Sequence, residues 1–113
     1  MMKILIVEDE ELAVKKIRKT LAGVDTTAEV AGVTDSIRAT VEWLENNPAP
    51  DLILMDIELS DGQSFEIFNR VKVTSAVVFT TSYDEFALRA FKVNSIDYLL
   101  KPVQKEDLDA ALR

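Results

Sequence analysis

The sequence contains no cysteine and no histidine, and only three glycines and three prolines occur among its 113 residues. These absences exclude a disulfide framework, a zinc site of the usual thiolate or imidazole type, and a catalytic triad with a histidine base. No stretch rich in glycine or serine marks a linker, so the length indicates one domain. Any chemistry must therefore depend on carboxylates, hydroxyls and lysine.

Excess positive charge and long apolar runs are also missing. Thirteen basic residues against twenty acidic ones give a net charge of −7, which opposes binding to a phosphate backbone. Apolar runs such as 4–7 and 52–55 are far shorter than the ~20 residues of a membrane helix, and no signal peptide is recognisable. We therefore expect a cytoplasmic domain that contacts neither a membrane nor nucleic acid directly.

Short apolar segments alternate with longer amphipathic ones along the whole chain. The short segments predict five strands, at 3–7, 27–33, 51–55, 76–81 and 98–100. Apolar residues at helical spacing predict helices over 11–21 and 84–92, and around the stripes Ile37/Val41/Leu44, Phe65/Phe68/Val71 and Leu108/Ala111/Leu112. This alternation is typical of an α/β fold, here a single doubly wound domain of five strand-helix units on a five-stranded parallel sheet.

Local signals predict where some of these helices begin and end. Thr34 or Asp35 is expected to cap the second helix, and Gly23 to follow the end of the first. Trp43 lies off the main apolar stripe and is interpreted as edge packing or a surface patch. The sequence stops at Arg113 when the last helix has about two turns, so we expect a further domain downstream.

Polar side chains stand where four of the predicted strands end. Glu8 and Asp9 follow the first strand, Asp56 the third, Thr81 closes the fourth and Lys101 follows the fifth. The carboxyl ends of parallel strands meet at one edge of a sheet, where ligands bind. Converging carboxylates require a cation, and oxygen ligands alone favour Mg²⁺, with Mn²⁺ as an alternative. With the lysine available to phosphate oxygens, the pattern indicates a phosphate receiver in which Asp56 is the nucleophile.

Less specific interpretations also apply to some of these residues. Glu10 and Glu11 are interpreted as a solvated first turn of a helix, and the hydroxyls of Thr80 and Thr81 could cap a helix. Asp56, in contrast, directly follows four apolar residues of a buried strand, where an unpaired carboxylate would cost several kcal/mol. A metal ion or lysine partner explains Asp56 better than a loop cap does.

Together these segments resemble the receiver domain of two-component response regulators. The resemblance covers residues 1–113 and rests on the segments ILIVEDE (4–10), LILMDIELSDG (52–62), FTTS (79–82) and DYLLKP (97–102). It implies a flavodoxin-like fold with strand order 2-1-3-4-5. FTTSYDEFA (79–87) and AFKVNSIDY (90–98) further resemble the LytR/AlgR-type receivers that precede a LytTR-type DNA-binding domain, which this chain does not contain. The resemblance thus implies transcriptional regulation through a downstream output domain.

The resemblance also implies roles for individual residues. Asp56 would accept a phosphoryl group from a sensor histidine kinase, and Lys101 would pair with that group. Asp9, Asp56 and the backbone carbonyl of Glu58 would hold Mg²⁺, with Glu8 assisting through water. The domain would then act as a signalling phosphoacceptor rather than an enzyme, with only self-phosphorylation and autodephosphorylation as its chemistry.

Other features implied by the resemblance concern the switch. Thr81 would move its hydroxyl onto the phosphoryl group and Tyr98 would turn inward, although Thr80 competes with Thr81 for this role. The Lys101–Pro102 bond could be cis, and phosphorylation would promote a homodimer. Ser60 stands where the family commonly has proline, so we expect a more mobile loop after the third strand.

Two other function classes remain open from the sequence. A Mg²⁺-dependent hydrolase, Toprim-like or of the aspartate-nucleophile phosphatase type, would use the carboxylates directly, with Glu58 as a second acid after Asp56. A degenerate receiver would bind partners without being phosphorylated. The complete set of acids, threonine and lysine argues against the degenerate form.

Overall fold

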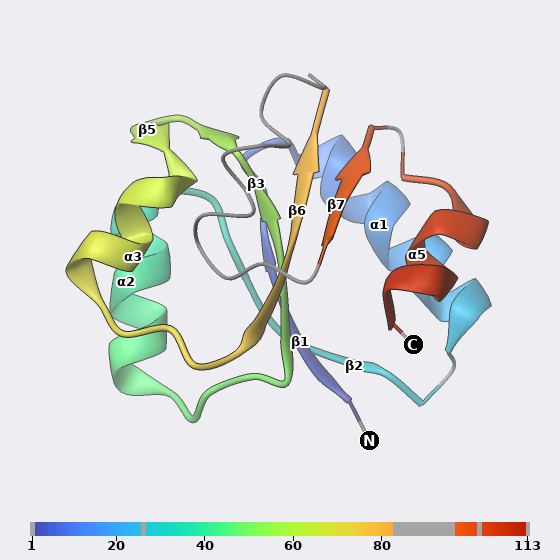
Figure 1. Cartoon of the computed structure of the whole chain (residues 1–113), viewed down its shortest axis with the longest axis horizontal. Helices are drawn as coiled ribbons and strands as arrows, with labels where there is room; N and C mark the ends of the chain where they lie inside the picture. The colour runs from blue at the N-terminus through green and yellow to red at the C-terminus, as the bar shows by residue number, and fades with distance from the viewer. Residues whose placement is uncertain (1, 26, 83–96, 102, 113) are drawn as a thin grey trace.

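The computed structural model describes residues 2–25, 27–82, 97–101 and 103–112. Five strands of this part form one parallel sheet (Figure 1): β1 (Lys3–Val7), β2 (Glu29–Thr34), β3 (Leu52–Asp56), β6 (Ala76–Thr81) and β7 (Asp97–Leu100). Their order is β2-β1-β3-β6-β7. Since β6 and β7 are the fourth and fifth strands of this sheet, the expected order 2-1-3-4-5 is confirmed.

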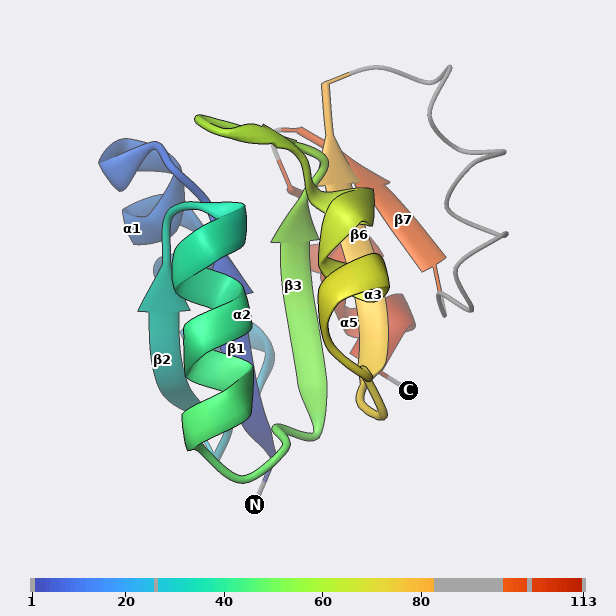
Figure 2. The same ribbon diagram turned by 90° about the vertical axis from the view of Figure 1, so that its left-hand side faces the viewer.

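Helices cover both faces of the sheet. One face carries α1 (Glu11–Val24) and α5 (Lys105–Leu112), and the other carries α2 (Ile37–Asn46) and α3 (Ile67–Arg70) (Figures 1 and 2). Successive strand residues point to opposite faces, so Ile4 and Ile6 pack on the α1–α5 side while Leu5 and Val7 pack on the α2–α3 side. Burial on both faces explains the nearly continuous apolar strands.

Two helix boundaries differ from the sequence-based predictions. The cap of α2 is Ser36, whose Oγ accepts a hydrogen bond from the Ala39 amide at 3.0 Å, so the prediction of Thr34 or Asp35 is wrong. Thr34 is still part of β2, and its hydroxyl contacts that of Thr40 at 2.7 Å. Gly23 lies inside α1, which ends at Val24, and is therefore not the predicted helix stop. The helix predicted over 84–92 lies outside the described residues.

A small antiparallel hairpin follows β3, which the sequence patterns do not predict. It pairs β4 (Glu58–Leu59) with β5 (Gly62–Gln63) around the turn Ser60-Asp61. Gly62 has φ +136°, a conformation that a residue with a side chain adopts only with strain. The 3₁₀ helix η1 (Ser64–Glu66) leads from the hairpin into α3.

The third helical segment packs its aromatic side chains as predicted. Phe65 and Phe68 contact the buried ring of Phe79, with ring centroids 5.2 Å and 6.1 Å apart. Val71 also packs against this cluster but follows the end of α3. Among the helices described, none is long and apolar enough to span a bilayer.

Trp43 packs at the edge of the sheet, which is one of the two positions that the sequence analysis expects for it. Its indole lies against Gly32 of β2, and a Cβ built on that glycine would be 2.5 Å from Nε1 and 2.9 Å from Cε2 of the indole. Gly23 of α1 offers a contrast, because its Cβ would meet only Lys105 Cε, at 3.9 Å. Of these two glycines, only Gly32 lies so close to a neighbour that a side chain is excluded.

We expect Gly32→Ala to lower the free energy of unfolding by about 1–3 kcal/mol, because the indole must move and lose its contact. Urea unfolding followed by the fluorescence of the single tryptophan measures the loss, and the native emission should shift to the red. Gly23→Ala is the matched control and should stabilise the helix by about 0.5–1 kcal/mol. If the two variants are equally stable, the account of Gly32 is wrong.

Candidate functional site

The strand register brings three charged side chains to one edge of the sheet. In β1 and β3, Ile6 is paired with Leu54, and the charged residues Glu8 and Asp56 follow these by two positions. Lys101 follows Leu99 of β7 in the same way. Residues two apart in a strand share a face, and the three apolar residues belong to the cluster on the α1–α5 side. Beyond the last apolar residues of this face, the side chains are therefore polar, and Glu8, Asp56 and Lys101 meet there.

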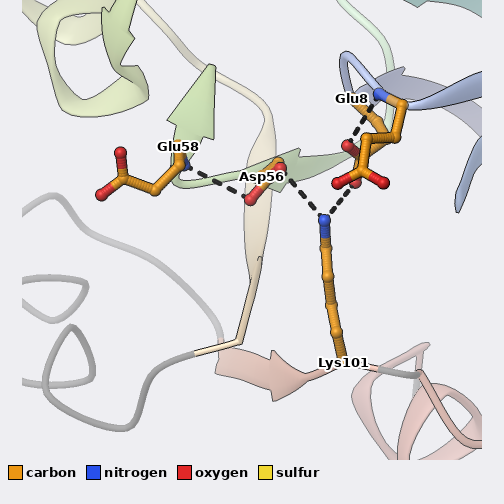
Figure 3. Close-up of polar contacts among 5 residues, drawn as sticks. Glu8, Asp56, Glu58 and Lys101 are labelled. Carbon is orange, nitrogen blue, oxygen red and sulfur yellow. Dashed lines mark hydrogen bonds and ion pairs between the residues drawn. The ribbon is translucent and has the colours of Figure 1, made fainter. Parts of the chain in front are cut away.

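Lys101 lies between the two carboxylates and contacts both (Figure 3). Its Nζ is 2.5 Å from Glu8 Oε1 and 3.0 Å from Asp56 Oδ2. The Glu8 side chain is fully buried, and only 9% of the Asp56 side chain is exposed. A buried charge is tolerated only when it is paired and hydrogen-bonded, so the ammonium is what allows both acids to lie here.

Backbone amides satisfy the remaining oxygen of each carboxylate. The Glu10 amide donates to Glu8 Oε2 at 3.1 Å, and the Glu58 amide donates to Asp56 Oδ1 at 3.3 Å (Figure 3). Both carboxylates therefore have one oxygen on the shared ammonium and the other on an amide two residues further along the chain. This arrangement fixes the orientation of the Asp56 carboxylate.

The shared ammonium affects the two carboxyls differently. Burial raises the pKa of Asp56 to about 6, although the hydrogen bond from Lys101 opposes the shift. Burial also opposes ionisation of Glu8, but the hydrogen bonds from Lys101 and the Glu10 amide outweigh it and hold the pKa of Glu8 below its usual value. Burial would lower the pKa of Lys101, yet its bonds to the two carboxylates raise it. Around neutral pH the site thus holds two anionic carboxylates and one ammonium.

A second group of acids lies at the start of α1. Carboxylate oxygens of Glu8, Asp9 and Glu10 all lie within 4.8 Å of one another. Burial and a hydrogen bond with Glu8 raise the pKa of Asp9. Glu10, which the sequence analysis interprets as part of a solvated first turn, is exposed and also lies within this group. Asp56 does not belong to this group, since the Lys101 ammonium lies between it and Glu8.

Other predicted site residues are placed less fully. Thr80 is buried and is the register partner of Asp56 on β6, and its carbonyl accepts a hydrogen bond from the Ile57 amide at 3.2 Å. Thr81 ends β6, but its side chain and that of Tyr98 lie outside the described residues, as does Pro102. Which of the two threonines acts in the switch therefore stays a prediction. The cis Lys101–Pro102 bond stays a prediction as well.

Three kinds of similarity agree with this geometry. Residues 4–113 match the family model described as the response regulator receiver domain. The chain is 39% identical to sensory transduction protein LytT of Bacillus anthracis over 100% of its own length and 46% of that protein. It is 35% identical to the positive alginate biosynthesis regulatory protein of Pseudomonas aeruginosa, over 99% of its own length and 46% of that protein.

A solved structure shares the fold at useful sequence identity. The response regulatory domain of protein MrkE from Klebsiella pneumoniae superposes with a TM-score of 0.83 at 31% identity, over 98% of this chain and 92% of that one. The chain spans about half the length of the curated relatives it matches. The sequence match, the fold and the acidic edge of the sheet agree, and the chain belongs to the family of response regulator receiver domains, with LytT- and AlgR-type regulators among its relatives.

Proposed function

We propose that this domain accepts a phosphoryl group on Asp56 and thereby controls an output domain that regulates transcription. The observation that carries the proposal is the arrangement of Asp56 itself. It is a buried carboxylate at the end of β3, with Oδ2 on the Lys101 ammonium and Oδ1 on the Glu58 amide. Its oxygens are oriented, and a positive charge lies where a phosphoryl group would need one.

The proposed reaction forms an acyl phosphate. A carboxylate oxygen of Asp56 attacks the phosphorus of a phosphohistidine on the kinase, the phosphorus–nitrogen bond breaks, and the imidazole leaves with the bonding electron pair and takes up a proton. Lys101 would neutralise charge on the transferred group. Water later attacks the phosphorus, which restores Asp56 and releases inorganic phosphate, so the domain has autodephosphorylation as its own chemistry.

The acidic cluster at this edge suits a divalent cation. Carboxylate oxygens of Glu8, Asp9 and Glu10 lie close together, and oxygen ligands of this kind favour Mg²⁺, with Mn²⁺ as an alternative. In the proposed site, Asp9, Asp56 and the backbone carbonyl of Glu58 would hold the ion, with Glu8 assisting through water. When bound, such an ion supplies positive charge that offsets the repulsion between the carboxylates and the incoming phosphoryl group.

The switch and the partners belong to the same proposal. Thr81 would bond the phosphoryl group, and Tyr98 would turn inward behind it, so that a local charge biases a two-state element. The proposed partners are a sensor histidine kinase, an output domain downstream of residue 113, and a second copy of the domain after phosphorylation. We place these events in the cytoplasm.

The hydrolase alternative is not favoured. A phosphatase of the aspartate-nucleophile type would use Glu58 as its acid, two residues after Asp56. The Glu58 side chain is exposed, and its carboxylate points away from Asp56 and Lys101 (Figure 3). Its amide, not its carboxylate, contacts Asp56.

Intact mass after incubation with acetyl phosphate tests the proposal. We expect the wild type to gain the mass of one phosphoryl group when Mg²⁺ is present, and to gain little in a chelator. Asp56→Asn should gain none, because an amide cannot form the acyl phosphate. A wild type that stays unmodified in Mg²⁺, or an Asp56→Asn variant that gains the same mass, would contradict the proposed acceptor.

A further inference from the structure

The hairpin after Asp56 reaches across to the beginning of α2. Figure 2 shows β4–β5 extending over the end of α2 at which that helix starts. The contact centres on Asp61 in the hairpin turn. Its Oδ1 accepts a hydrogen bond from the Ile37 amide at 2.8 Å, and its Oδ2 accepts one from the Arg38 amide at 3.1 Å.

Asp61 completes the hydrogen bonding of this helix end. The first four amides of a helix have no partner within the helix. In α2, the third amide, of Ala39, bonds the Ser36 Oγ at 3.0 Å, and the fourth, of Thr40, makes the first regular helical bond, to the Ser36 carbonyl at 3.0 Å. The first two, at Ile37 and Arg38, bond Asp61 instead, from a segment more than twenty residues away. The bonds from Ile37 and Arg38 lower the pKa of Asp61, so the carboxylate is ionised at neutral pH.

Packing supports the same contact. A Cβ built on Gly62 would lie 3.3 Å from Ile37 Cδ1, so the hairpin backbone lies directly on the first residue of α2. Leu59 of β4 is buried in the same apolar cluster as Ile37. The base of the segment is closed separately by the Ser64 amide, which donates to the Ile57 carbonyl at 2.8 Å. The turn of the hairpin is thus held on α2 and its base is held beside β3.

The hairpin carries the amide that orients Asp56. Glu58 begins β4 and pairs with Gln63, while its amide donates to Asp56 Oδ1. At 3.3 Å this bond is long, so it depends on the position of the strand that carries it. The Ser60 hydroxyl also donates to the Asp35 carbonyl, at 3.5 Å, but the two bonds that Asp61 accepts are the shorter links between the hairpin turn and the start of α2.

We infer that Asp61 is a positioning residue for the acceptor site: by holding the hairpin turn on α2, it keeps the Glu58 amide on Asp56. This inference rests on the proposed function. It also bears on the loop after β3, for which the sequence predicts greater mobility because Ser60 replaces the family's proline. At the neighbouring position, the hydrogen bonds that Asp61 accepts from α2 restrain the loop instead of a proline ring.

Two substitutions separate positioning from simple helix capping. Asp61→Ala removes the cap and releases the hairpin, whereas Ser36→Ala removes a cap of the same helix and leaves the hairpin bonds in place. Each should lower the thermal midpoint, since loss of a cap costs about 0.5–2 kcal/mol. Only Asp61→Ala should slow phosphoryl uptake from acetyl phosphate, by roughly tenfold or more, because small misplacements of a reacting group are costly.

The rates are measured at saturating Mg²⁺, well below the thermal midpoint of every variant, with hydrogen exchange of the Glu58 amide followed in parallel. We expect faster exchange at Glu58 in Asp61→Ala alone, and an intermediate uptake rate for Asp61→Asn, which keeps one acceptor oxygen. An Asp61→Ala variant that reacts at the wild-type rate, or no more slowly than Ser36→Ala, overturns the inference alone. A wild type that takes up no phosphoryl group overturns the proposed function, and the inference with it.

Discussion

Lys101→Met is expected to lower the free energy of unfolding by about 3–5 kcal/mol at neutral pH, the usual cost of removing one partner from a buried ion pair. The substitution keeps the length of the side chain but leaves Glu8 and Asp56 facing each other without the ammonium that both contact. Neither carboxylate is exposed enough for water to replace that contact. Chemical unfolding at pH 7 measures the loss.

The loss should depend on pH. Without Lys101 the folded-state pKa values of both carboxyls rise above those of the unfolded chain, so the folded state binds the additional protons. Stability of the variant is then greatest below about pH 4 and falls as the pH rises through the new values. The difference in unfolding free energy between wild type and variant should therefore be small in acid and reach its full size at neutral pH.

The same variant should also fail as a phosphoryl acceptor. Loss of one preorganised charge that stabilises a transition state costs about 10²–10³ in rate. Lys72→Met is the matched control, since Lys72 is exposed in the turn before β6 and the change in net charge is the same. Two results would contradict the role of the ion pair. Lys101→Met would unfold at the same denaturant concentration as the wild type, or the difference in unfolding free energy between the two would not change with pH.

The strand pattern predicts the fold class, and the polar strand ends predict three residues that meet at the candidate site. Apolar runs such as 4–7 and 52–55 can be buried only in a sheet covered on both faces, and parallel strands bring their carboxyl ends together. That rule alone places Glu8, Asp56 and Lys101 at one edge. The strand order, in contrast, came only from the resemblance, because periodicity does not specify which strands are neighbours.

What the sequence could not specify depends on contacts between distant segments. The cap of α2 differs from the prediction because three adjacent residues, Thr34 to Ser36, all have capping side chains, and only the end of β2 decides among them. The two hydrogen bonds that Asp61 accepts from the Ile37 and Arg38 amides join segments more than twenty residues apart, and no local sequence signal indicates them. Lys101 was expected to meet a phosphoryl group, and its simultaneous contact with Glu8 follows only from the register of the sheet.

Asp56→Asn should make the domain more stable while it abolishes phosphoryl uptake. The pKa of Asp56 rises from 3.8 to about 6 on folding, mainly through burial. A shift of this size means that ionised Asp56 costs about 3 kcal/mol of folding free energy above pH 6, a cost that vanishes below pH 4. Asparagine removes the ionisation and still offers an oxygen to the Glu58 amide. We expect a gain of about 1–3 kcal/mol at pH 7.

Unfolding in a chelator from pH 4 to pH 8 checks this expectation, since a bound divalent cation would itself stabilise the wild type. The gain should be absent near pH 4 and should grow as the pH rises through 6, the range in which wild-type Asp56 loses its proton. Glu45→Gln, at an exposed position near the end of α2, makes the same change of charge and should leave stability within about 0.5 kcal/mol of wild type. A variant less stable than wild type at pH 7, or a gain that is constant over the range, would contradict the account.

Higher stability together with lost phosphoryl uptake would show that the ionised Asp56 carboxylate both destabilises the fold and is required for the reaction. Asp56 is ionised against the preference of its surroundings, and Lys101 offsets only part of that cost. Under the proposed function, a divalent cation bound at these oxygens would add positive charge and offset part of the cost of ionised Asp56. We expect the more stable variant to be the inactive one, because asparagine removes the ionised group that destabilises the fold and cannot form the acyl phosphate.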